Sequence, residues 1–142
     1  MAVRLQAADA SWYGTWKMDT SKSHFENVPI AKSFMVVIRK EGENDVLDFA
    51  IVDAEGKPLK AHLTQPRKGG NVSGLHPTDL YDGATVAVPD DHHWVYAYKK
   101  NGQTVAERHV TLSADGKSHE AKLTGKTPDG KTFVEDEYMV RQ

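Results

Sequence analysis

The stretch DDHHWVYAYKKNG, residues 90–102, concentrates side chains that carry out chemistry in proteins. It contains two aspartates, the adjacent histidines His92 and His93, and three aromatic residues. Imidazoles bind metal ions and transfer protons near neutral pH, and aromatic rings often wall binding pockets. The stretch is therefore either a metal or catalytic site, or a strand that is rich in functional side chains. If the strand belongs to a barrel, we expect residues 90–93 to form the entrance.

The dipeptide Asn101-Gly102 predicts a two-residue hairpin turn, because both turn positions need a positive φ that these residue types tolerate. Pairing across this turn places Trp94 opposite His109. Side chains alternate along a strand, so one face is expected to hold His92, Trp94, Tyr96, Tyr98, Glu107 and His109. The other face is expected to hold His93, Val95, Ala97, Ala106, Arg108 and Val110. His92 and His93 then point apart and cannot bind one metal ion together.

The face that carries the aromatic residues supports two functional hypotheses. In an enzyme, His109 would be the general base, Glu107 would orient it, and Tyr96 or Tyr98 would donate to an oxyanion. The reaction would be hydrolysis or isomerisation of a small ester, lactone or ketone, with metal assistance as one variant. In a binding protein, the ligand contacts would come from Trp94, Tyr96, Tyr98, His92 and His62. A plainer alternative makes the aromatics ordinary core residues, with Glu107 and His109 an exposed pair on the outer wall.

No metal ligands are assigned from the sequence, because H-E-x-x-H, EF-hand and cysteine patterns are all absent. Two or three converging imidazoles, including His62, would suit a metal or haem. Calcium is a further alternative, because it takes oxygen ligands from loops. The loop residues that would serve it are His76, Asp79, Asp82, Asp90 and Asp91.

The composition narrows the class of partner. The 142 residues carry a formal net charge of −2, and no run of lysine and arginine suggests a nucleic-acid or membrane surface. No apolar segment approaches the roughly 20 residues that span a bilayer. The expected partner is a small apolar molecule, with no nucleic acid and no membrane insertion.

Turn signals with glycine recur along the chain and predict the elements that position these side chains. Between the turn signals lie segments rich in Val, Thr, Phe, Tyr and Ile. The spacing of the turns is typical of an all-β meander or barrel. The predicted strands lie near residues 11–18, 32–40, 45–53, 58–65, 84–89, 92–100, 103–113, 117–125 and 131–141. A helical turn is expected at residues 19–23, and a long loop with one short strand at residues 66–83. Closure into a single antiparallel up-and-down barrel of eight to ten strands would hide both sheet edges.

Three blocks of the sequence are similar to a family of small, exported bacterial lipocalin-like proteins, mostly without an assigned activity. They are the G-T-W-K block at residues 14–17, the Y-K-K-N-G turn at residues 98–102, and the final Y-x-x-R-Q at residues 138–142. The resemblance implies a calycin-type barrel in which Trp16 closes the floor and Arg141 packs on it. It also favours an aromatic inner face.

Pairing across Asp115-Gly116 instead favours the smaller apolar face as the inner one, because it puts Val110 opposite Ala121 and Leu112 opposite His119. A β-bulge between the two hairpins would reconcile the alternatives, and we expect the aromatic face to point inward.

Residues 11–142 form the predicted domain. Residues 1–10 are expected to be a disordered tail or the remnant of a signal peptide, so the predicted location is periplasmic or secreted, with cytoplasmic as the alternative.

Overall fold

The computed structural model describes residues 11–78 and 80–142, and most of them lie in antiparallel strands. The bounds are β1 Gly14–Met18, β2 His24–Glu26, β3 Ser33–Glu41, β4 Asn44–Val52, β5 Pro58–Pro66, β6 Gly70–Asn71, β7 Gly83–Asp90, β8 His93–Lys100, β9 Gln103–Leu112, β10 Ser118–Lys126 and β11 Thr132–Arg141. A 3-10 helix, η1 Thr20–Lys22, follows Asp19, whose side chain accepts a hydrogen bond from the backbone N–H of Ser21 at 3.0 Å. This confirms the predicted helical turn.

Within the described ranges, no helix is long and apolar enough to cross a membrane.

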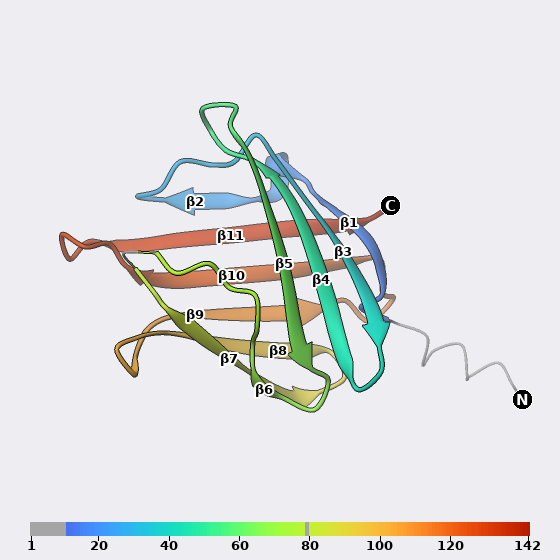
Figure 1. Cartoon of the computed structure of the whole chain (residues 1–142). Helices are drawn as coiled ribbons and strands as arrows, with labels where there is room; N and C mark the ends of the chain where they lie inside the picture. The colour runs from blue at the N-terminus through green and yellow to red at the C-terminus, as the bar shows by residue number, and fades with distance from the viewer. Residues whose placement is uncertain (1–10, 79) are drawn as a thin grey trace, which may run out of the picture.

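The strands form one sheet in the order β5-β4-β3-β1-β11-β10-β9-β8-β7-β6, and β2 pairs with β11. Figure 1 shows the sheet curling so that β3, β4 and β5 run across in front of β8 to β11. The two ends of the sheet nearly meet. This confirms the predicted all-β antiparallel barrel, and the side chains between the two halves form its core.

The seam of the barrel lies between β5 and the segment after β6. Thr64 and Ser73 form a single bridge there, with N···O distances of 3.0 and 2.8 Å. Gly74 has a φ of +89°, and a Cβ at this position would lie 2.1 Å from the carbonyl oxygen of His62. Only glycine allows the loop to approach β5 this closely. The short strand β6 within the long loop at residues 66–83 also agrees with the prediction.

The register between β8 and β9 differs from the predicted one beyond the turn. Asn101 and Gly102 have φ values of 52° and 82°, as the predicted turn requires. Lys99 pairs with Thr104, but Tyr98 pairs with Ala106, which leaves Val105 as an extra residue on β9. Every later pair is therefore shifted by one residue, and Trp94 lies opposite Val110 instead of His109.

This bulge brings the β8 residues of one candidate inner face and the β9 residues of the other into the core. Trp94, Tyr96 and Tyr98 on β8 are buried, and so are Ala106 and Val110 on β9. The expectation that the aromatic face points inward is confirmed. The bulge itself lies inside the first hairpin and not between the two hairpins, whereas the second hairpin pairs Val110 with Ala121 as predicted.

One end of the barrel is closed by stacked side chains. Trp16 is fully buried, and the Arg141 guanidinium carbon lies 4.2 Å from the centre of its ring system. Arg141 also donates hydrogen bonds to the carbonyl oxygens of Tyr13 at 2.6 Å, Gly116 at 2.8 Å, and Ser11. The packing of Arg141 on Trp16 that the family resemblance implied is confirmed.

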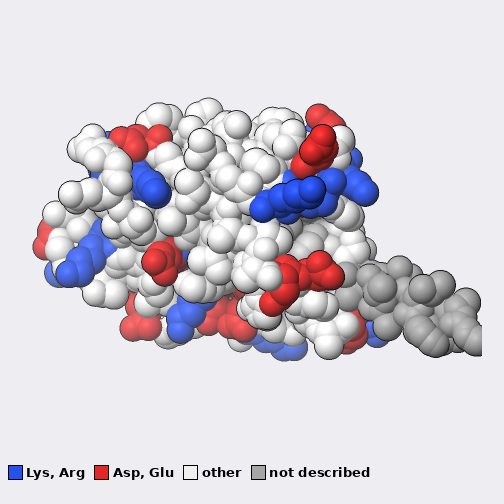
Figure 2. All heavy atoms as spheres, turned by 90° about the horizontal axis from the view of Figure 1, so that it is seen from below, with Lys and Arg blue, Asp and Glu red and all other residues white. Residues whose placement is uncertain are grey.

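The outer wall carries charges of both signs. On the face seen in Figure 2, acidic and basic side chains are interspersed, and neither sign forms a continuous patch. Exposed pairs such as Arg39 with Asp48 contribute to this pattern. This face therefore lacks the clustered positive charge that attracts a phosphate backbone.

Replacement of Arg141 by lysine tests the closed end of the barrel. Lysine keeps the charge but lacks the planar fork that reaches three carbonyl groups while stacking on Trp16. Arg141→Lys should lower the free energy of unfolding by about 1–3 kcal/mol in urea titrations. Arg39→Lys is the matched control at an exposed ion pair. It should change the free energy of unfolding by less than about 1 kcal/mol. Equal losses in the two variants would contradict this account.

Candidate functional site

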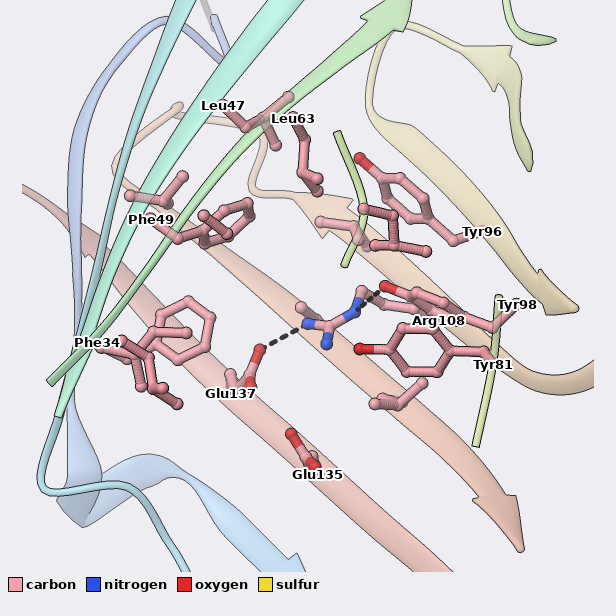
Figure 3. A pocket seen from close by; sticks show the side chains of 18 of the residues that line it. Phe34, Leu47, Phe49, Leu63, Tyr81, Tyr96, Tyr98, Arg108, Glu135 and Glu137 are labelled. Atoms are coloured by element: carbon pink, nitrogen blue, oxygen red, sulfur yellow. Dashed lines mark hydrogen bonds and ion pairs between the residues drawn. The ribbon is translucent and has the colours of Figure 1, made fainter. Parts of the chain in front are cut away.

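The barrel interior is not filled by its side chains, and a cavity of about 650 Å³ lies between the two halves of the sheet. Its walls are largely apolar and aromatic (Figure 3). The residues that form them most directly are Phe34, Leu47, Phe49, Leu63, Tyr96 and Tyr98. A cavity of this size and lining is typical of small-molecule sites.

The cavity opens at the end of the barrel opposite the Trp16–Arg141 stack. Its rim includes Leu59 at the start of β5, which is 47% exposed, and Leu75 and Tyr81 in the long loop. The prediction that residues 90–93 form the entrance is wrong. That turn lies at the closed end, where the indole N–H of Trp12 donates to the carbonyl oxygen of Asp91 at 3.0 Å.

A buried ion pair crosses the cavity wall. Arg108 on β9 donates from Nη1 to Oε1 of Glu137 on β11 at 2.7 Å, and from Nε to the Tyr98 hydroxyl at 3.1 Å. Glu137 is 1% exposed, and its second oxygen, Oε2, has no hydrogen-bond partner. Figure 3 shows the guanidinium between the Tyr98 hydroxyl and this carboxyl group, with Glu135 next to Glu137 along β11.

Burial changes the ionisation of the acid. Desolvation raises the pKa of Glu137 to about 7, because Arg108 only partly offsets it and the neighbouring Glu135 raises it further. Arg108 itself stays charged. Burial alone would lower its pKa, but Tyr98, Glu137 and Glu135 raise it well above the usual value.

Two further polar groups of the inner wall, the imidazole of His119 and the hydroxyl of Tyr96, stay neutral. Burial lowers the pKa of His119 to about 3, and the charges of Arg108 and Arg141 act in the same direction. Its imidazole packs edge-on against Trp16, with ring centres 4.5 Å apart. The Tyr96 hydroxyl donates to Oε1 of Gln65 at 2.5 Å, and burial raises the pKa of that hydroxyl. These groups offer hydrogen bonds without charge.

Three of the predicted ligand-contacting residues line the cavity: Trp94, Tyr96 and Tyr98. The predicted catalytic pair does not. Because of the bulge at Val105, His109 and Glu107 point outward, with side chains 59% and 56% exposed and 3.2 Å between Nε2 and Oε1. Their predicted place on the inner face is wrong, and the alternative of an exposed pair on the outer wall is correct.

His92 and His62 also lie outside the cavity lining. His92 sits in the turn before β8, where its Nδ1 is 3.1 Å from the carbonyl oxygen of Leu112. His62 is on the outer face of β5, with Nδ1 2.5 Å from Oδ1 of Asp48. The predicted contacts of these two histidines with an interior ligand are therefore wrong, and so is the convergence of imidazoles inside the barrel.

Across residues 11–78 and 80–142, no three His, Asp or Glu side chains lie close enough together to hold a metal ion. Of the loop residues considered for calcium, Asp79 lies outside the described residues, as do residues 1–10. His76 lies at the rim of the cavity.

Arg108, Glu135 and Glu137 were not among the predicted site residues. The signal in the sequence is the strict alternation along β11, where Phe133, Glu135, Glu137 and Met139 share one face. Two acids that alternate onto the same strand face as Phe133 and Met139 indicate buried carboxyl groups. The register predicted from the Asn101-Gly102 turn places Arg108 on the smaller apolar face. The bulge at Val105 turns the β9 residues of that face to the same side as the aromatic residues of β8.

Comparisons with known proteins identify no relative. No protein-family model matches the chain, and no curated protein shows significant sequence similarity to it. The geometry of the cavity therefore carries the functional argument.

The buried carboxyl group makes a pH-dependent contribution to stability that can be measured. Burial raises the pKa of Glu137 from its usual 4.5 to about 7, so in this range the folded state holds a proton that the unfolded state has lost. The stabilisation is fully present below pH 4.5 and is lost as the pH rises to about 7. Relative to Glu137→Gln, which cannot titrate, the native protein should lose about 2–4 kcal/mol over this range in urea titrations.

Glu43→Gln is the matched control for this measurement, because it makes the same change at an exposed carboxyl group, whereas Glu107 lies 3.2 Å from the imidazole of His109. The difference between the native protein and this control should stay nearly constant from pH 4.5 to 7. A constant difference between the native protein and Glu137→Gln over the same range would contradict a raised pKa.

Proposed function

We propose that this protein binds one small, largely apolar molecule inside its barrel. The observation that carries the proposal is an interior cavity of about 650 Å³ with largely apolar and aromatic walls. Cores normally pack with few voids larger than a water molecule, so an unfilled interior of this size is a costly feature unless a ligand fills it. The exposed apolar side chain of Leu59 at the rim supports an entrance for an apolar ligand.

Membership of a lipocalin-like family is part of the proposal. It is supported by the G-T-W-K block at residues 14–17 and by the Trp16–Arg141 stack at the closed end of the barrel. Export to the periplasm or beyond the cell is proposed on the small residues near the N-terminus alone. The hydrolase or isomerase alternative depended on His109 and Glu107 facing the interior, and their exposure removes that support.

Intrinsic tryptophan fluorescence provides the test, because Trp94 lines the cavity and the Trp12 ring stacks on the Trp94 ring, with ring centres 4.1 Å apart. Titration with the neutral probe N-phenyl-1-naphthylamine should quench this fluorescence with saturation at one probe per chain. Ala121→Phe places a ring in the cavity and should weaken probe binding at least about tenfold, which corresponds to about 1.4 kcal/mol.

Ala50→Phe adds the same ring at an exposed position of β4 and should leave the affinity unchanged. Circular dichroism and thermal unfolding confirm that both variants fold. Equal affinities in two folded variants, or no saturable quenching in the native protein, would contradict binding inside the barrel.

A further inference from the structure

The charged groups deep in the cavity are unbalanced, because the lining cation Lys60 lies at the exposed rim. Glu135 and Glu137 are the two acids that line it, and Arg108 is the one guanidinium among its described lining residues. Arg108 is already engaged, because Nη1 binds Glu137 and Nε binds the Tyr98 hydroxyl. With both acids ionised, this buried cluster therefore carries one negative charge too many. Burial and the neighbouring Glu135 raise the pKa of Glu137 to about 7, so a part of the molecules holds a proton there at neutral pH, which removes the excess charge.

The arrangement of the two acids is suited to a cation with several hydrogen-bond donors. Glu135 and Glu137 are two residues apart on β11, so they share a face, and Figure 3 shows their carboxyl groups next to each other. Oε2 of Glu137 is buried and has no N–H or hydroxyl partner, and its interaction with the Glu135 carboxyl group raises the pKa of Glu137. When Glu137 is ionised, this oxygen is a buried acceptor without a donor, which is costly, and a ligand that supplies a donor gains that free energy.

We propose that the cavity selects an amphiphilic amine, whose ammonium group binds between Glu135 and Glu137 while its apolar body lies along the aromatic wall. The inference rests on the proposed function, because it presupposes a ligand in the barrel. An ammonium group has three donors and no acceptor, which matches two carboxylates with a free oxygen. Its charge also replaces the proton that Glu137 otherwise holds.

Ligands with other head groups fit this cluster less well. A neutral alcohol offers a single donor and leaves the excess charge in place. A carboxylate would add a third negative charge next to the two acids, with a guanidinium that is already paired. The structure therefore favours the amine over an alcohol or a fatty acid with the same chain.

Amine binding should be linked to pH through Glu137. The charged or titratable groups that face it inside the barrel are Glu135, Arg108, Tyr98, Tyr81 and His119. His119 stays neutral from pH 5.5 upward, because its pKa is lowered to about 3. At the rim, Lys60 and His76 are exposed. His76 is thus a second lining residue with an imidazole, and its substitution provides a separate control.

The experiment compares 1-decylamine, 1-decanol and decanoate, which share one chain length, by displacement of N-phenyl-1-naphthylamine between pH 6 and 8. Decylamine stays an ammonium ion throughout, as a lysine side chain does. Only the ionised form of Glu137 accepts it, so its affinity should rise about tenfold from pH 6 to pH 8. The affinity for decanol should not change, and at pH 8 decylamine should bind at least about tenfold more tightly than decanol.

The variants assign this effect to one carboxyl group. Glu137→Gln should abolish both the pH dependence and the preference for the amine, whereas His76→Gln and the matched surface variant Glu107→Gln should keep both. Calorimetry on the native protein gives an independent test if Glu137→Gln fails to fold. In two buffers of different ionisation enthalpy, amine binding should release close to one proton at pH 6 and almost none at pH 8.5.

The outcomes distinguish a failure of amine selection from a failure of ligand binding. Equal binding of all three compounds, or tighter binding of decanoate, would overturn amine selection and leave apolar-ligand binding intact. A preference that survives in folded Glu137→Gln, or no proton release at pH 6, would also overturn the inference. If neither the probe nor any of the three compounds binds, both the proposed function and the inference fail.

Discussion

Strand β9 has one residue more than its pairing with β8 uses, and that residue is Val105. Beyond it the alternation of β9 is reversed relative to its partner. Arg108 and Val110 therefore join Trp94 and Tyr96 inside the barrel, while Glu107 and His109 turn to solvent. The composition of the inner wall depends on this bulge, because a shift of one residue moves a whole strand from one face to the other.

The neighbouring strands stabilise the bulge. β9 pairs with β10 without a break from Ala106 to Leu112. This pairing sets which side chains of β9 face the interior. At the end of this ladder Gly125 lies opposite Ala106, and a Cβ on Gly125 would be 2.8 Å from the Cβ of Ala106 and 3.0 Å from the ring of Phe133. The absence of a side chain there lets the two strands approach next to the bulge.

A buried ion pair such as Arg108 with Glu137 contributes little net stability, because the desolvation of both groups offsets their attraction. Apolar residues of similar volume would fill the barrel at least as well. The pair places the Glu137 carboxyl group at the wall of an open cavity instead, where the proposed ligand binding would be linked to its ionisation. This supports a role for the cluster in selecting the ligand over a role in holding the barrel together.

The elements follow from local signals in the sequence. The Asn101-Gly102 turn, the helical turn after Asp19 and the hairpin at residues 112–119 each need only a few neighbouring residues, and all three are as predicted. Alternation also marks Trp94 and Tyr96 as one face of a strand. The same alternation along β11 contains the signal for Glu137, although it was not used to predict the site.

The sequence by itself thus determined the class of fold, the position of most strands and the grouping of Trp94, Tyr96 and Tyr98 on one strand face, because turns and alternation depend on residues close together in the chain. Only the tertiary structure decided that His109 faces solvent and that Arg108 meets Glu137. Those positions depend on a bulge held by pairing with two neighbouring strands at once, and on burial by segments far away in the chain. The raised pKa of Glu137 has the same origin, because a carboxyl group is desolvated only when the barrel has closed around it.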